Sequence, residues 1–106
     1  RELVARWSGR PCHPEAYWFK APLSPNLAAR LEGIEPQLEA AQLPEGPLIV
    51  EGCGGVLTPL SDRYTMADLF LQWEMEWFIV SRHFLGSLNQ TLMTVEAVRA
   101  RAIEPA

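Results

Sequence analysis

The sequence predicts an α/β fold that contains a partial parallel sheet with flanking helices. Two short and wholly apolar runs, residues 48–50 and 77–80, have the composition of strands that are buried on both faces. A helix-capping pattern follows each run, at residues 65–68 and 87–90. The order strand, loop, helix, strand, loop, helix forms a βαβα unit, in which the strands are parallel.

The length and composition fit one small domain. The chain has 106 residues, a net charge of −4 and 48% hydrophobic residues, which allows a single small core. An acidic balance argues against nucleic acid or an anionic membrane as the main partner, and no apolar run has the roughly 18 residues of a membrane span. Two cysteines, Cys12 and Cys53, indicate a reducing compartment, and we expect a cytoplasmic protein. Because the first residue is Arg1 and not Met, we expect residues 1–106 to be one partial domain of a longer protein.

The first half of the chain is predicted to hold short helices separated by turns. Residues 1–8 have apolar side chains at helical spacing. Ser24 is expected to cap a helix that starts with proline and ends at Gly33. A further helix is expected to start near Pro36, before a turn at residues 44–47 with the sequence P-E-G-P.

Two helices are predicted in the second half. T-M-A-D at residues 65–68 is a capping pattern, and the helix that it opens is expected to run through Trp73. Ser87 and Gln90 have the same spacing and are expected to cap the final helix. The apolar side chains of that last helix are Leu88, Leu92, Val95, Ala97 and Val98.

The first candidate site is the run E-G-C-G at residues 51–54, directly after the first predicted strand. In open parallel sheets, ligands bind at the carboxyl ends of the strands. A carboxylate at this position, that of Glu51, suits magnesium, and the glycines let backbone amides approach a phosphate. The alternative is a glycine-rich turn in which Glu51 makes an ordinary hydrogen bond, and the spacing alone leaves both open.

The second candidate site follows the second predicted strand. Backbone amides and one carboxamide at a helix N-terminus would form a natural anion site. The alternative is a capped helix with Gly86 as a loop residue, and the residues alone favour this simpler interpretation. The residues concerned are Leu85, Gly86, Ser87, Leu88 and Asn89.

A phosphate-cradling loop is missing from the 106 residues. They contain a single lysine, Lys20, and no G-x-x-x-x-G-K motif. If the chain belongs to an enzyme that uses a nucleotide, we expect that loop to precede Arg1. The cysteines and histidines do not have the spacing of zinc ligands, and no Ser-His-Asp arrangement follows from the spacing.

Four motifs in order resemble those of the dethiobiotin synthetase family. Residues 50–60, V-E-G-C-G-G-V-L-T-P-L, match the family pattern V-E-G-A-G-G-x-x-x-P-L, and S-D-R-Y-T-M-A-D follows at 61–68. Residues 85–92, L-G-S-L-N-Q-T-L, are similar to L-G-x-I-N-H-x-L, and residues 21–26, A-P-L-S-P-N, to A-P-x-S-P-H. The resemblance covers nearly the whole chain.

This resemblance implies an ATP-dependent ligase of biotin biosynthesis. The implied fold is P-loop NTPase-like with three αβα layers, the implied assembly is a homodimer, and Mg²⁺ is the implied cofactor. The implied substrates are ATP, 7,8-diaminononanoate and CO2, which bicarbonate supplies. One amine of the diamine forms a carbamate, ATP phosphorylates it to a carbamic phosphate, and the second amine closes the ureido ring.

The resemblance also implies roles for individual residues. Glu51 would hold magnesium, and the triphosphate would lie along Glu51, Gly52, Cys53 and Gly54. Pro22 and Ser24 would lie near the diamine. The carboxylate end of the diamine would bind across the dimer interface, mainly at Asn89, together with Leu85, Gly86 and Ser87. The catalytic residues of the family are expected upstream of Arg1, and the segment that recognises adenine is expected after Ala106.

Some residues differ from the family pattern, and two alternatives stay open. Cys53 replaces the usual alanine, and Asn26 and Gln90 stand where histidine is common. One alternative is a related P-loop ATPase, of the partitioning type or the amidotransferase type that makes cobyrinate derivatives. The other is a truncated, non-catalytic copy. We expect the isolated 106 residues to be inactive and poorly folded, because the strand that bears the P-loop would be missing.

Overall fold

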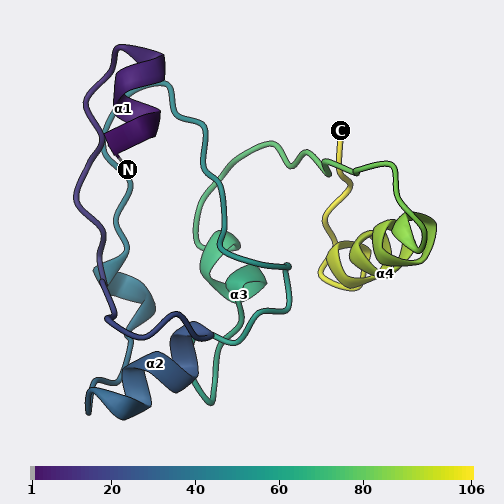
Figure 1. Ribbon diagram of the computed structural model, residues 1–106. Coiled ribbons are helices and arrows are strands. Elements are labelled where there is room, and N and C mark those ends of the chain that lie inside the picture. Colours follow the sequence, from purple (N-terminus) through teal and green to yellow (C-terminus); the bar gives the residue numbers. More distant parts are fainter. Residues whose placement is uncertain (1) are drawn as a thin grey trace.

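The computed structural model describes residues 2–106, and its regular structure is helical. Figure 1 shows α1 and α2 on one side of the central helix α3, with α4 on the other side. Long irregular segments connect these elements. The elements are α1 (Glu2–Ser8), α2 (Pro25–Leu31), the 3-10 helix η1 (Leu38–Ala40), α3 (Met66–Phe70) and α4 (Ser87–Arg99).

Helix α2 begins and ends where the sequence predicts, but its cap differs. It starts at Pro25, and Gly33 follows its last turn with φ +67°. Ser24 does not cap the helix through its side chain. Its hydroxyl instead donates to Oδ1 of Asn26 at 2.7 Å, so the prediction of a Ser24 side-chain cap was wrong. In this arrangement the hydroxyl is oriented toward the neighbouring Asn26 side chain and accepts no hydrogen bond from an amide of the first turn.

Helix α3 begins with the predicted capping box. Oδ2 of Asp68 accepts hydrogen bonds from the backbone amide and the hydroxyl of Thr65, both at 2.7 Å. These hydrogen bonds favour the charged form, and they are the main reason why the pKa of Asp68 is lowered. Arg101 adds a smaller effect in the same direction. The helix ends at Phe70 and does not reach Trp73.

The start of α3 is joined to the segment that follows the glycine-rich run. The carbonyl oxygen of Thr58 accepts from the amide of Met66 at 2.9 Å, and that of Val56 accepts from the amide of Ala67 at 2.8 Å. These bonds satisfy two amides that have no partner within the helix. They hold residues 56–58 against α3, and so the glycine-rich run lies beside this helix.

Replacing Asp68 by asparagine in the full-length protein is expected to lower the free energy of unfolding by about 1 kcal/mol at neutral pH, because a charged acceptor is lost from the capping box. The folded pKa of Asp68 is lowered, so its contribution is complete above the unfolded pKa of about 3.9 and is lost as the pH falls through the lower, folded value. Urea unfolding of both proteins between pH 7 and pH 3 measures this. A stability difference that stays constant below pH 4 would contradict the assignment.

Helix α4 forms as predicted, with a different N-cap. Gly86 is the N-cap residue with φ +95°, and Ser87 is the first helical residue. The predicted cap by Ser87 was therefore wrong, because the left-handed glycine before it ends the loop one residue earlier. Val98 is buried, whereas Leu88 and Leu92 at the other end of the helix are exposed.

The two predicted strands are not formed in residues 2–106. Residues 48–50 and 77–80 are irregular, and Ile49 is 101% exposed. The β-pairing in this part of the chain is one isolated antiparallel bridge, between Pro59 and Thr65. A strand needs a neighbouring strand for its backbone hydrogen bonds, and neither run has one here. The helix expected from Pro36 is likewise reduced to the short element η1.

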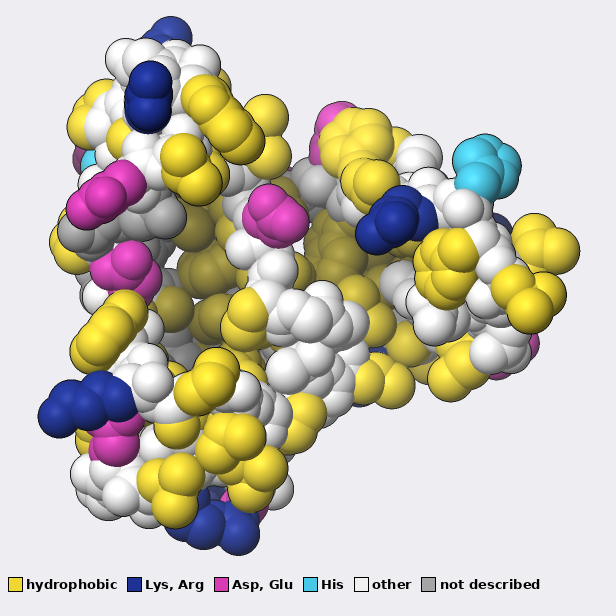
Figure 2. Space-filling model, in the orientation of Figure 1, with side chains coloured by type: hydrophobic (Ala, Val, Ile, Leu, Met, Phe, Trp, Pro, Cys, Tyr) yellow, Lys and Arg dark blue, Asp and Glu magenta, His cyan; other side chains and the backbone are white. Residues whose placement is uncertain are grey.

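The core is small. Its buried side chains come from α2, α3 and α4 and are Ala28, Ala29, Met66, Ala67 and Val98. Many large apolar side chains stay at the surface, and Figure 2 shows hydrophobic groups spread over the visible face and around the hollow at its centre. No helix within residues 2–106 is long and apolar enough to cross a membrane.

Candidate functional site

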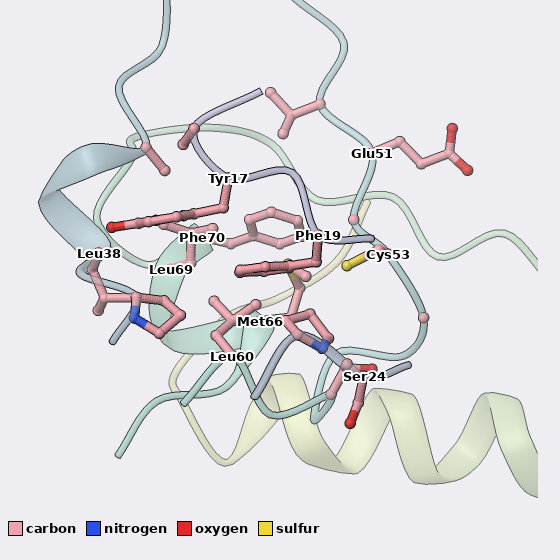
Figure 3. Close-up of a pocket in the computed structure, with 18 of the residues that line it drawn as sticks. Tyr17, Phe19, Ser24, Leu38, Glu51, Cys53, Leu60, Met66, Leu69 and Phe70 are labelled. Atoms are coloured by element: carbon pink, nitrogen blue, oxygen red, sulfur yellow. The ribbon is translucent and has the colours of Figure 1, made fainter. Parts of the chain in front are cut away.

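A mostly apolar cavity of about 630 Å³ lies between α3 and the segments around it. Figure 3 shows aromatic rings from residues 17–19 and from α3 above and beside it. The rings of Tyr17 and Phe19 are parallel, with centroids 6.1 Å apart and an angle of 6° between their planes. Several other side chains complete the wall, among them Leu38, Leu60, Met66, Leu69 and Phe70.

The predicted run at residues 51–54 forms one wall of this cavity. Glu51 is exposed, and in Figure 3 its carboxylate points away from the cavity toward solvent. Gly54 has φ +78°, and a Cβ atom there would lie 2.5 Å from the hydroxyl oxygen of Thr58. Both the backbone conformation and the contact with Thr58 therefore require glycine at position 54.

Gly52 is held in a different way. A Cβ atom at this position would lie 2.9 Å from Cζ of Phe70 and 3.1 Å from Cγ of Met66. The backbone of the run thus packs directly on side chains of α3. The loop is positioned by a helix, and not by the strand that the sequence predicts before it.

The side chains around the run offer few ligands for a metal ion. Within residues 2–106, no three His, Cys, Asp or Glu side chains converge on a point that could hold one. Glu51 offers a single carboxylate that faces solvent. One carboxylate fits Mg²⁺, which proteins often bind through one or two carboxylates while waters and phosphate oxygens fill the other positions.

The second predicted site lies at the N-terminus of α4. Leu85 is 102% exposed, and Asn89 is exposed with its Nδ2 3.4 Å from Sδ of Met93. The hydroxyl groups of Ser81 and Thr91 are 2.9 Å apart, which ties the preceding loop to the helix. No side chain caps the first turn, and α4 therefore presents amides and the positive end of its dipole at an open surface.

The structure brings together some of the predicted site residues and not others. Ser24 and residues 51–54 line the same cavity. Pro22 is exposed and lies outside the lining, and residues 85–89 do not contribute to it either. The two candidate sites are therefore separate surfaces within this chain.

Sequence reasoning missed the aromatic part of the cavity. Tyr17, Phe19 and Phe70 line it, yet nothing in their local sequence links residues 17–19 to α3. The dense aromatic composition of residues 17–19 and 70–77 was the available signal. Composition alone does not indicate which aromatic rings line the same cavity.

Comparison with known proteins gives the family. Residues 2–106 match the family model described as an AAA domain. The chain is similar to the ATP-dependent dethiobiotin synthetase BioD of Rhodopseudomonas palustris strain HaA2, with 46% identity over 108 residues that cover 97% of this chain and 51% of the relative. It is 47% identical over 107 residues to the enzyme of the same name from Agrobacterium fabrum, covering 96% of this chain and 50% of the relative.

These relatives confirm the resemblance that the four motifs predict. The enzyme of the same name from Sphingopyxis alaskensis is 41% identical over 102 residues, covering 96% of this chain and 50% of the relative. The chain spans about half the length of the curated relatives that it matches. No solved structure is significantly similar to it. The family match supports the P-loop NTPase-like fold class, and because it extends over residues 2–106, the chain belongs to the AAA domain family.

Proposed function

We propose that the chain forms part of an ATP-dependent dethiobiotin synthetase. The observation that carries the proposal is the 46% identity over 97% of the chain to a protein of that name. The reaction is a cyclising ligation, in which 7,8-diaminononanoate, CO2 and ATP give the ureido ring of dethiobiotin, ADP and phosphate. It runs through a carbamate on one amine, a carbamic phosphate, and attack by the second amine.

The run at residues 51–54 is assigned to the triphosphate of ATP. Contacts with Phe70, Met66 and Thr58 hold the backbone at Gly52 and Gly54 in place. Because glycine has no side chain, a phosphate can approach such a backbone closely, which supports the assignment. Glu51 would hold Mg²⁺, and this ion would neutralise phosphate charge during transfer. Phosphoryl transfer needs little from the protein beyond positioning and charge, and one carboxylate with several amides suits that need.

The N-terminus of α4 is assigned to the carboxylate end of the diamine. Its 13 residues give the helix a full macrodipole. The first turn has no capping side chain and no acidic residue, so it favours an anion. Asn89 would donate from its carboxamide, and the backbone amides of the first turn that follow Ser87 would supply further donors, with Leu85, Gly86 and Ser87 beside them. The amide of Ser87 itself donates to the carbonyl oxygen of Phe84 at 3.1 Å. Ser24 lies in the cavity wall and would contact the diamine near its amines, with Pro22 beside it.

A homodimer is the proposed assembly. The two candidate sites do not share a cavity within one chain, although both would bind parts of one reaction. A second copy can place its α4 terminus over the cavity of the first. The exposed Leu85, Leu88 and Leu92 support this assignment, because apolar side chains around the terminus would be covered by such a contact. We also propose that residues 48–50 and 77–80 join a parallel sheet in the full-length protein, although they form no strand in residues 2–106, and that the protein is cytoplasmic.

The test uses the full-length protein with Mg²⁺, ATP and bicarbonate. ADP release is followed with and without 7,8-diaminononanoate. The proposal predicts ADP release that depends on the diamine. Release without this dependence would point to a related ATPase, and nucleotide binding without any turnover would point to a non-catalytic copy. Either result would contradict the proposed function.

A further inference from the structure

Phe70, the last residue of α3, sets the space that is available to the glycine-rich run. A Cβ atom at Gly52 would lie 2.9 Å from Cζ and 3.2 Å from Cε2 of this ring. Carbon atoms in contact normally lie about 3.5–4.0 Å apart. The backbone of Gly52 is not left-handed, in contrast to that of Gly54. Contact with the ring, and not backbone conformation, therefore makes glycine necessary at position 52.

The ring of Phe70 cannot move away freely. Its centroid lies 5.9 Å from that of Trp73 and 5.7 Å from that of Trp77, and the second pair is edge-to-face with an angle of 73°. Both separations fall in the favourable range of aromatic pairs. Met66, which is also in contact with the Gly52 position, is buried in the core. Movement of the ring would break these contacts.

The backbone of Trp77, one of the aromatic neighbours of Phe70, is held by a hydrogen bond. The carbonyl oxygen of Trp77 accepts a hydrogen bond from the amide of Ala106 at 2.8 Å. Trp73 lines the same cavity as Phe70. The Phe70 ring therefore lies in contact with Trp73 and Trp77 and also with the position of Gly52.

We propose that Phe70 is a positioning residue of the nucleotide site. Its ring fills the space that a side chain at position 52 would need. The ring, supported by Trp73 and Trp77, fixes the backbone of residues 51–54 and with it the direction of the amides and of Glu51. This inference rests on the proposed role of residues 51–54 in binding the triphosphate. The inference can be tested directly, because a smaller side chain at position 70 can make room for a larger one at position 52.

The test is a double-mutant cycle in the full-length protein, with Gly52→Ala, Phe70→Leu and both together. The equilibrium Kd of ATP with Mg²⁺ is measured for each protein, together with the urea midpoint. Gly52→Ala is expected to weaken ATP binding about tenfold, and Phe70→Leu about threefold. The double variant is expected to bind ATP about as well as Phe70→Leu alone, because leucine leaves room for the new methyl group. Such coupling is typical of residues in contact.

Two further measurements separate positioning from stability. The KM of the diamine is expected to change less than about twofold in Phe70→Leu, since the coupling is to the nucleotide run. Phe78→Leu is the matched control, because Phe78 is 69% exposed and lies outside the cavity lining. This variant should keep the wild-type affinity for ATP. Its effect and that of Gly52→Ala should be additive. If Gly52→Ala alone fails to fold, the inference requires the double variant to fold and to bind ATP.

Additive effects of Gly52→Ala and Phe70→Leu on ATP affinity would overturn the inference. Recovery of the urea midpoint without recovery of ATP affinity would also overturn it, since the ring would then only stabilise the fold. These outcomes are distinct from failure of the proposed function. The double-mutant cycle measures the affinity for ATP. The proposed function is instead refuted if the wild-type protein shows no diamine-dependent ADP release.

Discussion

Replacement of Glu51 by glutamine in the full-length protein is expected to lower kcat/KM by about 100-fold or more. An amide oxygen lacks the charge that Mg²⁺ requires, and even indirect disturbance of a metal ligand commonly costs about 10–100-fold. The variant should still bind the diamine with unchanged affinity, because the diamine site is assigned to Ser24 and the α4 terminus. ADP release at increasing Mg²⁺, and calorimetry with the diamine, measure the two effects.

The matched control for this prediction is Glu45→Gln. Glu45 is an exposed acid in the bend at residues 45–47, and the substitution removes the same charge at a position outside the cavity lining. Its kcat/KM should stay within about twofold of the wild-type value, as is typical of a surface change. If Glu51→Gln weakened diamine binding as much as turnover, the division of roles between the two sites would be wrong.

Replacement of Asn89 by alanine should instead weaken binding of the diamine. Loss of a hydrogen bond to a charged group costs about 1–3 kcal/mol, which corresponds to about a 5–150-fold increase in Kd. The Asn89 side chain is exposed, and its carboxamide makes a long contact of 3.4 Å with the sulfur of Met93, so the helix itself should be little affected. Calorimetry with the diamine, and urea unfolding of the same samples, measure both quantities.

A variant of the same shape tests whether the group bound at Asn89 is a carboxylate. Asn89→Asp keeps the shape but adds a negative charge beside the substrate carboxylate, and it should weaken diamine binding more than Asn89→Ala does. The control is Gln72→Ala, which removes an exposed carboxamide between α3 and Trp73 and should leave the Kd unchanged. Equal diamine affinity in wild type and in Asn89→Asp would exclude a carboxylate site at this helix end.

The sequence located the helices because their signals are local. Pro25 starts α2, the pair Thr65 and Asp68 forms the capping box of α3, and α4 begins directly after Gly86. Each signal needs only residues within one turn of the helix end. The errors at Ser24 and Ser87 concern only the cap. The Ser24 hydroxyl donates to Asn26, and Gly86 takes the N-cap position before Ser87, but both helices still lie where the sequence predicts.

The strands could not be located in the same way, because strand formation depends on distant partners. Residues 48–50 and 77–80 have the apolar composition of buried strands, but composition does not supply the hydrogen-bond partners of their backbones. The candidate site shows the same limit. Residues 51–54 were identified from their own motif, whereas the role of Phe70 depends on a contact across 18 positions of sequence between it and Gly52.

The fate of labelled bicarbonate tests the proposed reaction directly. The full-length protein is incubated with Mg²⁺, ATP, 7,8-diaminononanoate and ¹³C-bicarbonate, and the product is analysed by mass spectrometry. We expect one ureido product whose ring carbon carries the label, formed only when ATP and the diamine are both present. ATP hydrolysis by a folded protein with no label in any product of the diamine would contradict it.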